Sequence, residues 1–344
     1  MSEALDRAVM LCDHLTDTQL RQQKVTAWHW GPALFGHALT RLDDQLGEPR
    51  YDRWLRHWCD HHLAAGPAVN QSDTAAPALI TYPMQQRPDG EKYRPLTESV
   101  INYIRSEPRI VGEACNHLGP SLIGRFYPRS VWVDSLMMFG VFPAWYGTAE
   151  GATDLRDIAA SQPEAYSDLM QHPSGLWSHS WWARTGSAYP DNLFWGRGNG
   201  WVVAALPMIM EHLGDHERVP GIAEVLRRTS EALLPLQGDD GTWTTLLDRG
   251  GYRELSATAL IAAGWFDAVR LGHLPDSYLA PATKALAAVT DAVTPTAMPE
   301  ISGPTIPLPL LPELGYRWIP RGANHPYGVA AFVFATIAAE MAFR

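Results

Sequence analysis

Two kinds of helical segment alternate along this chain, and the alternation is the feature that most limits how it folds. Apolar residues recur with helical spacing almost throughout, whereas the alternation typical of strands is confined to short pieces such as 242–247. One kind of segment is apolar nearly all round and is expected to be buried on every side. The segments of this kind are 27–46, 73–84, 131–147, 197–213, 253–270 and 325–343.

The other kind of segment carries a single apolar stripe and is expected to lie half exposed. In 276–291, for example, Leu279, Ala282 and Leu286 follow one another at spacings of three and four residues. Helices buried on both sides, each joined to an amphipathic neighbour, fit a closed double ring. The sequence therefore predicts an all-α fold, an (α/α)6 barrel of six inner and six outer helices. The outer segments are 3–15, 50–63, 90–106, 151–171, 217–236 and 276–291.

Length and composition fit one large barrel. No Ser/Gly-rich or charged linker divides the 344 residues, so we predict a single domain over 1–344. The chain is 46% hydrophobic and only 19% charged, and its 14 Trp exceed what a core needs, which suggests a carbohydrate ligand. A formal net charge of −10 argues against nucleic acid and against a membrane as partners. An anionic ligand would therefore need a local basic pocket.

The chain shows no signal for membrane insertion, disulfide formation or metal binding. No stretch of about 18 apolar residues occurs, and the acidic start lacks the basic and apolar regions of a secretory signal. Cys12, Cys59 and Cys115 are odd in number and widely spaced, which favours reduced thiols and a cytoplasmic location. Segment 57–62 holds His and Cys at ligand spacing, but it reads as a packing stripe. We expect no metal and no cofactor, and the oligomeric state carries no sequence signal.

In such a barrel the inner helices run parallel, so their N-termini gather at one end, the mouth of the barrel. Their dipoles sum there and prepare that end for an anion. Unusual polar and aromatic residues open the inner helices, and we expect them to converge at the mouth. These residues are Trp28, His29 and Trp30, Asp73, Asp134, Arg197, Glu254, and His325 with Tyr327.

Segment 194–201, Phe-Trp-Gly-Arg-Gly-Asn-Gly-Trp, combines two indoles, a cation and three glycines in one turn. Glycines allow close approach of the backbone to a ligand, and indole faces stack on sugar rings. The guanidinium of Arg197 suits a carboxylate held by two parallel hydrogen bonds. The glycine spacing does not fit a nucleotide loop. The stretch therefore predicts a site for an anionic sugar.

Two aspartates are candidates for chemistry. Asp134 lies in the apolar stretch 131–138, where a carboxylate must be hydrogen-bonded, protonated or both. Apolar surroundings raise a carboxyl pKa, and a raised pKa for Asp134 would suit a proton donor. Asp73 opens the second inner helix, where a role as N-cap or as first-turn acid is the competing interpretation.

Several motifs together resemble glycoside hydrolase family 105, the unsaturated rhamnogalacturonyl hydrolases, and its sister family 88, the unsaturated glucuronyl hydrolases. The resemblance runs through nearly the whole chain. The strongest matches are Trp132-Val133-Asp134 followed by Met137 or Met138, Gly175-Leu176-Trp177-Ser178-His179, and the stretch 194–201; weaker ones lie at 241–243, 254–257 and 326–332.

The resemblance implies hydration of a 4,5-unsaturated uronyl residue, with protonation at C4, attack of water at C5, and collapse of the hemiketal. The family's acid/base falls on Asp134 and its assisting carboxylate on Asp73. His179, Trp195, Arg197 and Trp201 match positions that line the uronyl subsite. The aromatic opening that includes Trp30 would form a wall of that subsite. The partner would be a small anionic oligosaccharide.

Two other functions fit the same residues. A conventional glycosidase would use Asp134 as the acid and Asp73 or Glu254 to activate water. A sugar-binding protein without chemistry would keep the aromatic mouth alone. The proline-rich stretch 295–312 is expected to form a long rim loop that shapes the subsite beyond the uronate.

Overall fold

A closed ring of inner helices forms the centre of the computed structural model, which describes residues 2–344. Each inner helix packs against the next one along the chain, and the last packs against the first. The predicted (α/α)6 barrel is therefore confirmed. The inner helices are α2 (Trp30–Leu46), α5 (Ala78–Gln85), α7 (Val141–Ala149), α9 (Gly196–Leu213), α11 (Leu255–Arg270) and α14 (Pro326–Ala342).

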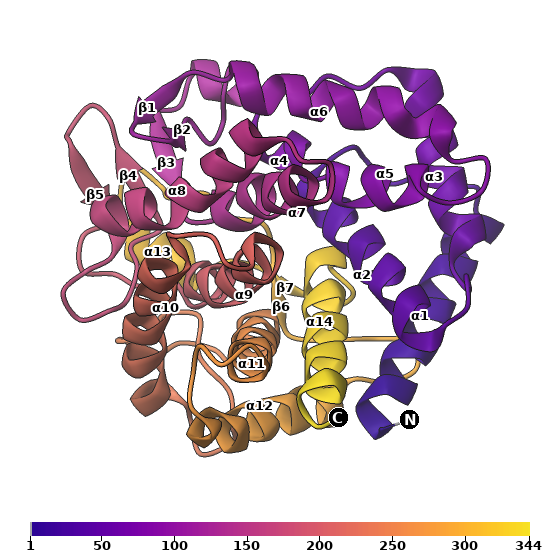
Figure 1. The fold of residues 1–344 in the computed structure, drawn as a ribbon. Helices are drawn as coiled ribbons and strands as arrows, with labels where there is room; N and C mark the ends of the chain where they lie inside the picture. Colours follow the sequence, from indigo (N-terminus) through magenta and orange to yellow (C-terminus); the bar gives the residue numbers. More distant parts are fainter. Residues whose placement is uncertain (1) are drawn as a thin grey trace.

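A second ring surrounds the first, and Figure 1 shows these outer helices around the edge of the molecule. Each packs on an inner helix, and α1 also contacts α12, which closes the outer ring. The side chain of Arg7 on α1 fastens this closure by donating to the carbonyls of Thr290 and Val293, at 2.6 and 3.0 Å. The outer helices are α1 (Glu3–Arg21), α3 (Asp52–Ala65), α6 (Arg94–Ser106), α8 (Thr153–Met170), α10 (Val219–Leu233) and α12 (Leu279–Ala292).

The burial of the two rings follows the two sequence patterns. On α14 every residue from Tyr327 to Ala338 is buried, as expected for a helix with neighbours on all sides. On α6 burial is confined to one face that includes Leu96, Val100 and Ile104. Burial of apolar area at about 25 cal/mol per Å² makes this double layer the main source of stability.

Two inner segments are less regular than predicted. Segment 73–84 divides into α4 (Ser72–Ala75) and α5, because Pro77 lacks an N–H and its ring crowds the preceding turn. Segment 131–147 starts as strand β3 (Ser130–Trp132), turns at 133–135, and becomes helical only in a π-helical turn, Leu136–Gly140, before α7. Asp134 therefore lies in a turn at the start of the third inner helix and not within it. Segment 242–247 forms isolated bridges only.

Three small antiparallel sheets connect the helices. β1 (Arg109–Val111) pairs with β2 (Ala114–Cys115), and β6 (Ile301–Ser302) pairs with β7 (Arg321–Gly322). The third sheet has the order β3, β4 (Ser180–Trp182), β5 (Ser187–Tyr189), with Trp132 opposite Ser180. The predicted rim loop thus includes β6. The segment 303–320, which we call the rim segment, leaves from β6 and returns at β7, and it contains α13 (Pro312–Arg317).

The remaining expectations concern thiols and membranes. The three cysteines are buried thiols. His62, in the stretch considered as a metal site, bonds the carbonyl of Thr26 at 3.0 Å and packs on Trp58, so it belongs to the core. Within residues 2–344, no helix combines the length and the apolarity that crossing a membrane requires.

Candidate active site

Asp134 is held beside His179 by the pairing of β3 with β4. The N–H of Val133 donates to the carbonyl of His179 at 3.0 Å, so the two side chains leave neighbouring strands at the same level. Oδ2 of Asp134 lies 3.2 Å from Nε2 of His179. The Asp134 side chain is 14% exposed, whereas that of His179 is fully buried. The carboxylate is thus open to a ligand on one side and backed by an imidazole on the other.

Asp73 has a similar arrangement. Oδ1 of Asp73 lies 3.4 Å from Nε2 of the buried His117, and Oδ2 lies 3.6 Å from Nε2 of the more exposed His29. The N-cap of α4 is Gln71, whose side chain forms a capping box with Thr74. Asp73 is therefore not the cap. It is an acidic residue of the first turn of α4, which the competing interpretation also allowed, and its side chain faces imidazoles.

A chain of hydroxyl groups brings the two carboxylates into one site. Ser72 precedes Asp73 and Ser135 follows Asp134, and the Ser135 hydroxyl donates to that of Ser72 at 3.0 Å. Nδ1 of His117 bonds the same Ser135 hydroxyl at 2.8 Å. The start of the second inner helix and the turn of the third are thereby joined at the mouth.

The environment of Asp134 differs from the apolar one that its sequence neighbours suggest. Burial by itself would raise the pKa of Asp134, but His179, His117 and Arg197 together lower that pKa below its ordinary value. The predicted raised pKa is therefore wrong, because the polar partners come from segments distant in sequence. Burial also lowers the pKa of His179 despite the attraction of Asp134. Near neutral pH the pair is carboxylate with neutral imidazole.

Arg197 is buried, 1% exposed, and its terminal nitrogens bind protein groups. One donates to the carbonyl and the hydroxyl of Ser302, with the carbonyl at 2.7 Å, and the other donates to the carbonyl of Gly303 at 2.8 Å. Oε1 of Glu254 lies 3.7 Å from Nη1 of Arg197. A two-pronged grip on a substrate carboxylate by these nitrogens would require the bonds to Ser302 and Gly303 to break. In this structure Arg197 anchors the start of the rim segment.

The glycines of 194–201 serve helix packing. A Cβ on Gly196 would stand 2.4 Å from the carbonyl oxygen of Thr244, and one on Gly198 would stand 2.9 Å from the ring of Trp195. A Cβ on Gly200 would meet the side chain of Leu260 on α11. The expectation that these glycines admit a ligand is wrong, because α9 uses them to approach protein neighbours.

The predicted aromatic residues differ in exposure. Trp195 and Trp201 are buried, at 2% and 0% exposed, and the ring of Trp195 stacks on His179 at 4.4 Å. Trp30 is partly exposed and lies 4.5 Å from the ring of Tyr327 and 6.0 Å from that of Trp201. Trp28 packs on Trp58 in the core. Of these residues, Trp30 presents the most accessible aromatic surface.

Several buried polar atoms around these side chains have no hydrogen-bond partner within residues 2–344. They are N–H donors, and buried polar groups in folded proteins are nearly always paired. A polar ligand at the mouth would pair them. The atoms are Nε of Arg197 and Nε1 of Trp195 and Trp201.

Glu254, the alternative base of a conventional glycosidase, is fully engaged. It caps α11, accepts from the hydroxyl of Ser256 and from the N–H of Ser302 at 2.7 and 2.9 Å, and is 0% exposed. A carboxylate that serves so many donors is not free to activate water. The structure therefore removes Glu254 from that role.

The sequence analysis missed two functional candidates and gave no role to a third. His117 and Tyr316 contact Asp73 and His179, respectively, and His29 was expected only to open an inner helix. His117 follows β2, and Tyr316 lies on α13, so their contacts depend on the tertiary fold. Sequence spacing carries no signal for either contact. In the part of the chain that the structure describes, no group of three or more His, Cys, Asp or Glu is arranged to hold a metal ion.

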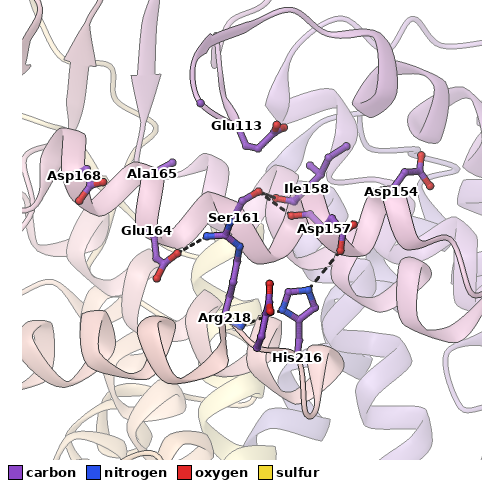
Figure 2. A pocket seen from close by; sticks show the side chains of 12 residues that line it. Glu113, Asp154, Asp157, Ile158, Ser161, Glu164, Ala165, Asp168, His216 and Arg218 are labelled. Carbon is purple, nitrogen blue, oxygen red and sulfur yellow. Dashed lines mark hydrogen bonds and ion pairs between the residues drawn. The ribbon is translucent and has the colours of Figure 1, made fainter.

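A groove lies outside the barrel (Figure 2). This groove, of about 820 Å³, runs along α8 and is lined mainly by acidic residues. Its basic side chains already have partners, since Arg218 bonds Glu164 at 2.7 Å and His216 lies 3.5 Å from Asp157. These pairs are exposed and solvated, so the groove lacks the buried unpaired atoms of the mouth.

Comparison with known proteins agrees with the barrel fold. The model of Glycosyl Hydrolase Family 88 matches residues 5–343. The chain is 26% identical over 274 residues to the unsaturated rhamnogalacturonyl hydrolase YesR of Bacillus subtilis, covering 78% of this chain and 76% of that one. It is 29% identical over 293 residues to the unsaturated 3S-rhamnoglycuronyl hydrolase of Alteromonas sp., covering 80% and 70%.

Solved structures share the fold. A family 105 glycoside hydrolase from C. acetobutylicum superposes with a TM-score of 0.82 at 20% identity, over 97% of this chain and 99% of that one. The unsaturated glucuronyl hydrolase of Bacillus sp. GL1 superposes with a TM-score of 0.75 at 14% identity, over 96% and 95%. The resemblance inferred from the motifs is thereby confirmed.

Proposed function

The chain belongs to glycosyl hydrolase family 88, and we propose that it acts on oligosaccharides ending in a 4,5-unsaturated uronyl residue by hydrating the double bond. Its curated relatives carry names of this activity. The observation that carries the proposal is the pairing at the mouth of two partly exposed carboxylates, Asp134 and Asp73, each with a buried imidazole.

In this proposal Asp134 moves the proton. A resting carboxylate becomes a proton donor when the uronate binds, because a nearby negative charge and exclusion of water both raise the pKa of Asp134. Its proton passes to C4 while a water molecule adds at C5. The water then returns a proton to Asp134, which ends the step as it began.

The remaining steps break the glycosidic bond. The hydroxyl added at C5 makes a hemiketal, which opens to a ketone and frees the ring oxygen. C1 then carries a hemiacetal, which collapses to an aldehyde and releases the next sugar as an alcohol. Atoms balance with one water consumed, and no cofactor takes part.

We propose that Asp73 orients the attacking water, with its carboxylate positioned beside the imidazoles of His117 and His29. His179, Trp195 and Trp201 would border the uronate, and Trp30 would form the outer aromatic wall. Arg197 would contribute positive potential and its free Nε, while its terminal nitrogens hold the rim segment. A cytoplasmic location remains a prediction from the cysteines.

The test follows the ultraviolet absorbance of the conjugated double bond with oligosaccharides made by a polysaccharide lyase. Hydration predicts loss of absorbance in step with release of the next sugar. A conventional glycosidase would release that sugar while the absorbance at first persists, and it would also cleave the saturated uronide. Persistence of absorbance during sugar release would overturn the proposal.

A further inference from the structure

The rim segment, residues 303–320, lies largely at the surface, but the side chain of Tyr316 is fully buried. Leu310 is 82% exposed and Trp318 is 77% exposed, whereas Tyr316 between them is 1% exposed. The phenol oxygen of Tyr316 lies 2.7 Å from Nδ1 of His179. The ring of Tyr316 also packs near Trp195, at 6.0 Å between ring centroids. The segment thus sends one polar group into the site behind Asp134.

The base of the rim segment is fixed by buried interactions. Arg197 binds Ser302 and Gly303, Tyr327 donates to the carbonyl of Ser302 at 2.6 Å, and Glu254 accepts from the N–H of Ser302. Two further phenols tether the middle of the segment from outside the site. Tyr127 bonds the carbonyl of Pro307 and Tyr189 bonds that of Leu308, both at 2.5 Å. The position of Tyr316 is therefore held from several sides.

The chemistry of the three groups sets the direction of their hydrogen bonds. Burial raises the pKa of Tyr316 well above that of an ordinary phenol, so the hydroxyl keeps its proton. Burial lowers the pKa of His179, so the ring is neutral and carries one N–H. When the phenol donates to Nδ1, that N–H is on Nε2 and faces Oδ2 of Asp134 at 3.2 Å. The Tyr316 hydroxyl then donates to Nδ1 of His179, and Nε2–H of His179 donates toward the Asp134 carboxylate.

We propose that Tyr316 is a positioning residue, whose hydroxyl fixes the tautomer and orientation of His179 so that Nε2–H supports the Asp134 carboxylate. The inference rests on the proposed function, because it concerns how Asp134 is readied for that reaction. A third group that orients an imidazole is a recurring element of catalytic sites. Here that group comes from a segment of the barrel rim, and the substrate need not touch it.

Removing the Tyr316 hydroxyl has a defined electrostatic consequence. Nε2–H becomes a weaker donor and the ring loses its fixed orientation, so the Asp134 carboxylate is less stabilised and its pKa rises. The other charged or titratable groups around the pair are His117 beyond β2, Asp73 on α4, Arg197 on α9, and Glu254 behind Arg197. All of these remain in place when Tyr316 is changed.

The test compares Tyr316→Phe with Tyr189→Phe. Both variants remove a phenol hydroxyl. Tyr316 belongs to the rim segment and bonds His179, whereas Tyr189 lies outside the segment and bonds the carbonyl of Leu308. For Tyr316→Phe we expect kcat to fall roughly tenfold or more with little change in KM, as for loss of an orienting partner. We also expect the alkaline limb of the kcat profile, where Asp134 loses its proton in the complex, to move up by about one pH unit.

The outcomes separate this inference from the proposed function. Equal kcat values and pH profiles for Tyr316→Phe and Tyr189→Phe would overturn the positioning role while leaving the hydration reaction intact. The same fall in kcat in both variants without a pH shift would reduce Tyr316 to a structural tether. If wild-type protein leaves the double bond untouched, the proposed function itself fails.

Discussion

The two ends of the barrel both bury histidines among the inner helices, but only the mouth pairs them with carboxylates. At the far end, His37 on α2 and His212 on α9 border a cavity of about 270 Å³ together with Trp145. Burial lowers the pKa of His37 to about 3 and that of His212 to about 4, so both are neutral. His212 stacks on Trp145 at 5.5 Å.

At the mouth, His179 and His117 each approach an aspartate that is partly exposed. The far-end carboxylate Asp267 is instead 3% exposed and shares Arg270 with Glu211. Both ends therefore contain buried histidines and nearby aspartates. The difference lies in whether a carboxylate remains accessible beside its imidazole. On this difference we base the proposal that the mouth is the site of chemistry and the far end is part of the core.

The largest expected effect comes from changing a carboxylate at each end. Asp134→Asn keeps the volume but cannot carry a proton, so kcat should fall by about 10²–10⁴ or more. The same change at the far end, Asp267→Asn, should lower stability but keep kcat within about twofold. The measurement is the absorbance assay with both variants, checked for folding by circular dichroism. An Asp134→Asn enzyme with more than about a tenth of wild-type turnover would contradict the assignment.

The next effect compares the buried Arg197 with the partly exposed Arg270. In Arg197→Lys one ammonium cannot serve Ser302 and Gly303 together, so the start of the rim segment loosens. We expect a loss of roughly 1–3 kcal/mol in unfolding free energy and a fall of roughly tenfold in kcat/KM. Arg270→Lys at the far end should lower stability alone. Equal losses of activity in Arg197→Lys and Arg270→Lys would contradict the proposal that only the mouth takes part in the reaction.

The smallest effect concerns pH and stability at the far end. The folded-state pKa of His212, about 4, lies below its ordinary value of 6.5, so the unfolded chain binds protons first as pH falls. The contribution of neutral His212 to the free energy of unfolding is therefore fully present above pH 6.5 and is lost toward pH 4. At pH 5 the loss is about 2 kcal/mol. His212→Gln should flatten this slope in urea titrations, and the exposed His14→Gln should not. An unchanged slope in His212→Gln would show that His212 is protonated in the folded state.

The sequence predicted the double ring, which the structure confirms, and it singled out Asp134 and Asp73 as candidates, because helical periodicity and motif identity are local properties. It did not predict the partners of those residues. Tyr316 meets His179 across 137 residues, and Arg197 meets Ser302 across 105. The local apolar stretch around Asp134 indicated a raised pKa, whereas imidazoles from distant loops lower the pKa of Asp134.

Glycines were misread for a related reason. A glycine-rich turn indicates close approach but does not say to what, and Gly196 approaches the carbonyl of Thr244. The break at Pro77 was visible in the sequence, but the apolar pattern continued across it. Local sequence patterns thus predicted the helices, whereas the contacts between distant segments could be identified only from the three-dimensional structure.

We propose that Asp134 delivers a solvent-derived proton to C4 of an unsaturated uronide. The most direct measurement runs the wild-type reaction in deuterated water and follows the uronyl product by NMR at early times. The account predicts a single deuterium on one face of C4, appearing at the rate of turnover, before exchange next to the new ketone fills both positions. Release of the next sugar with the C4 vinyl hydrogen still in place would contradict it.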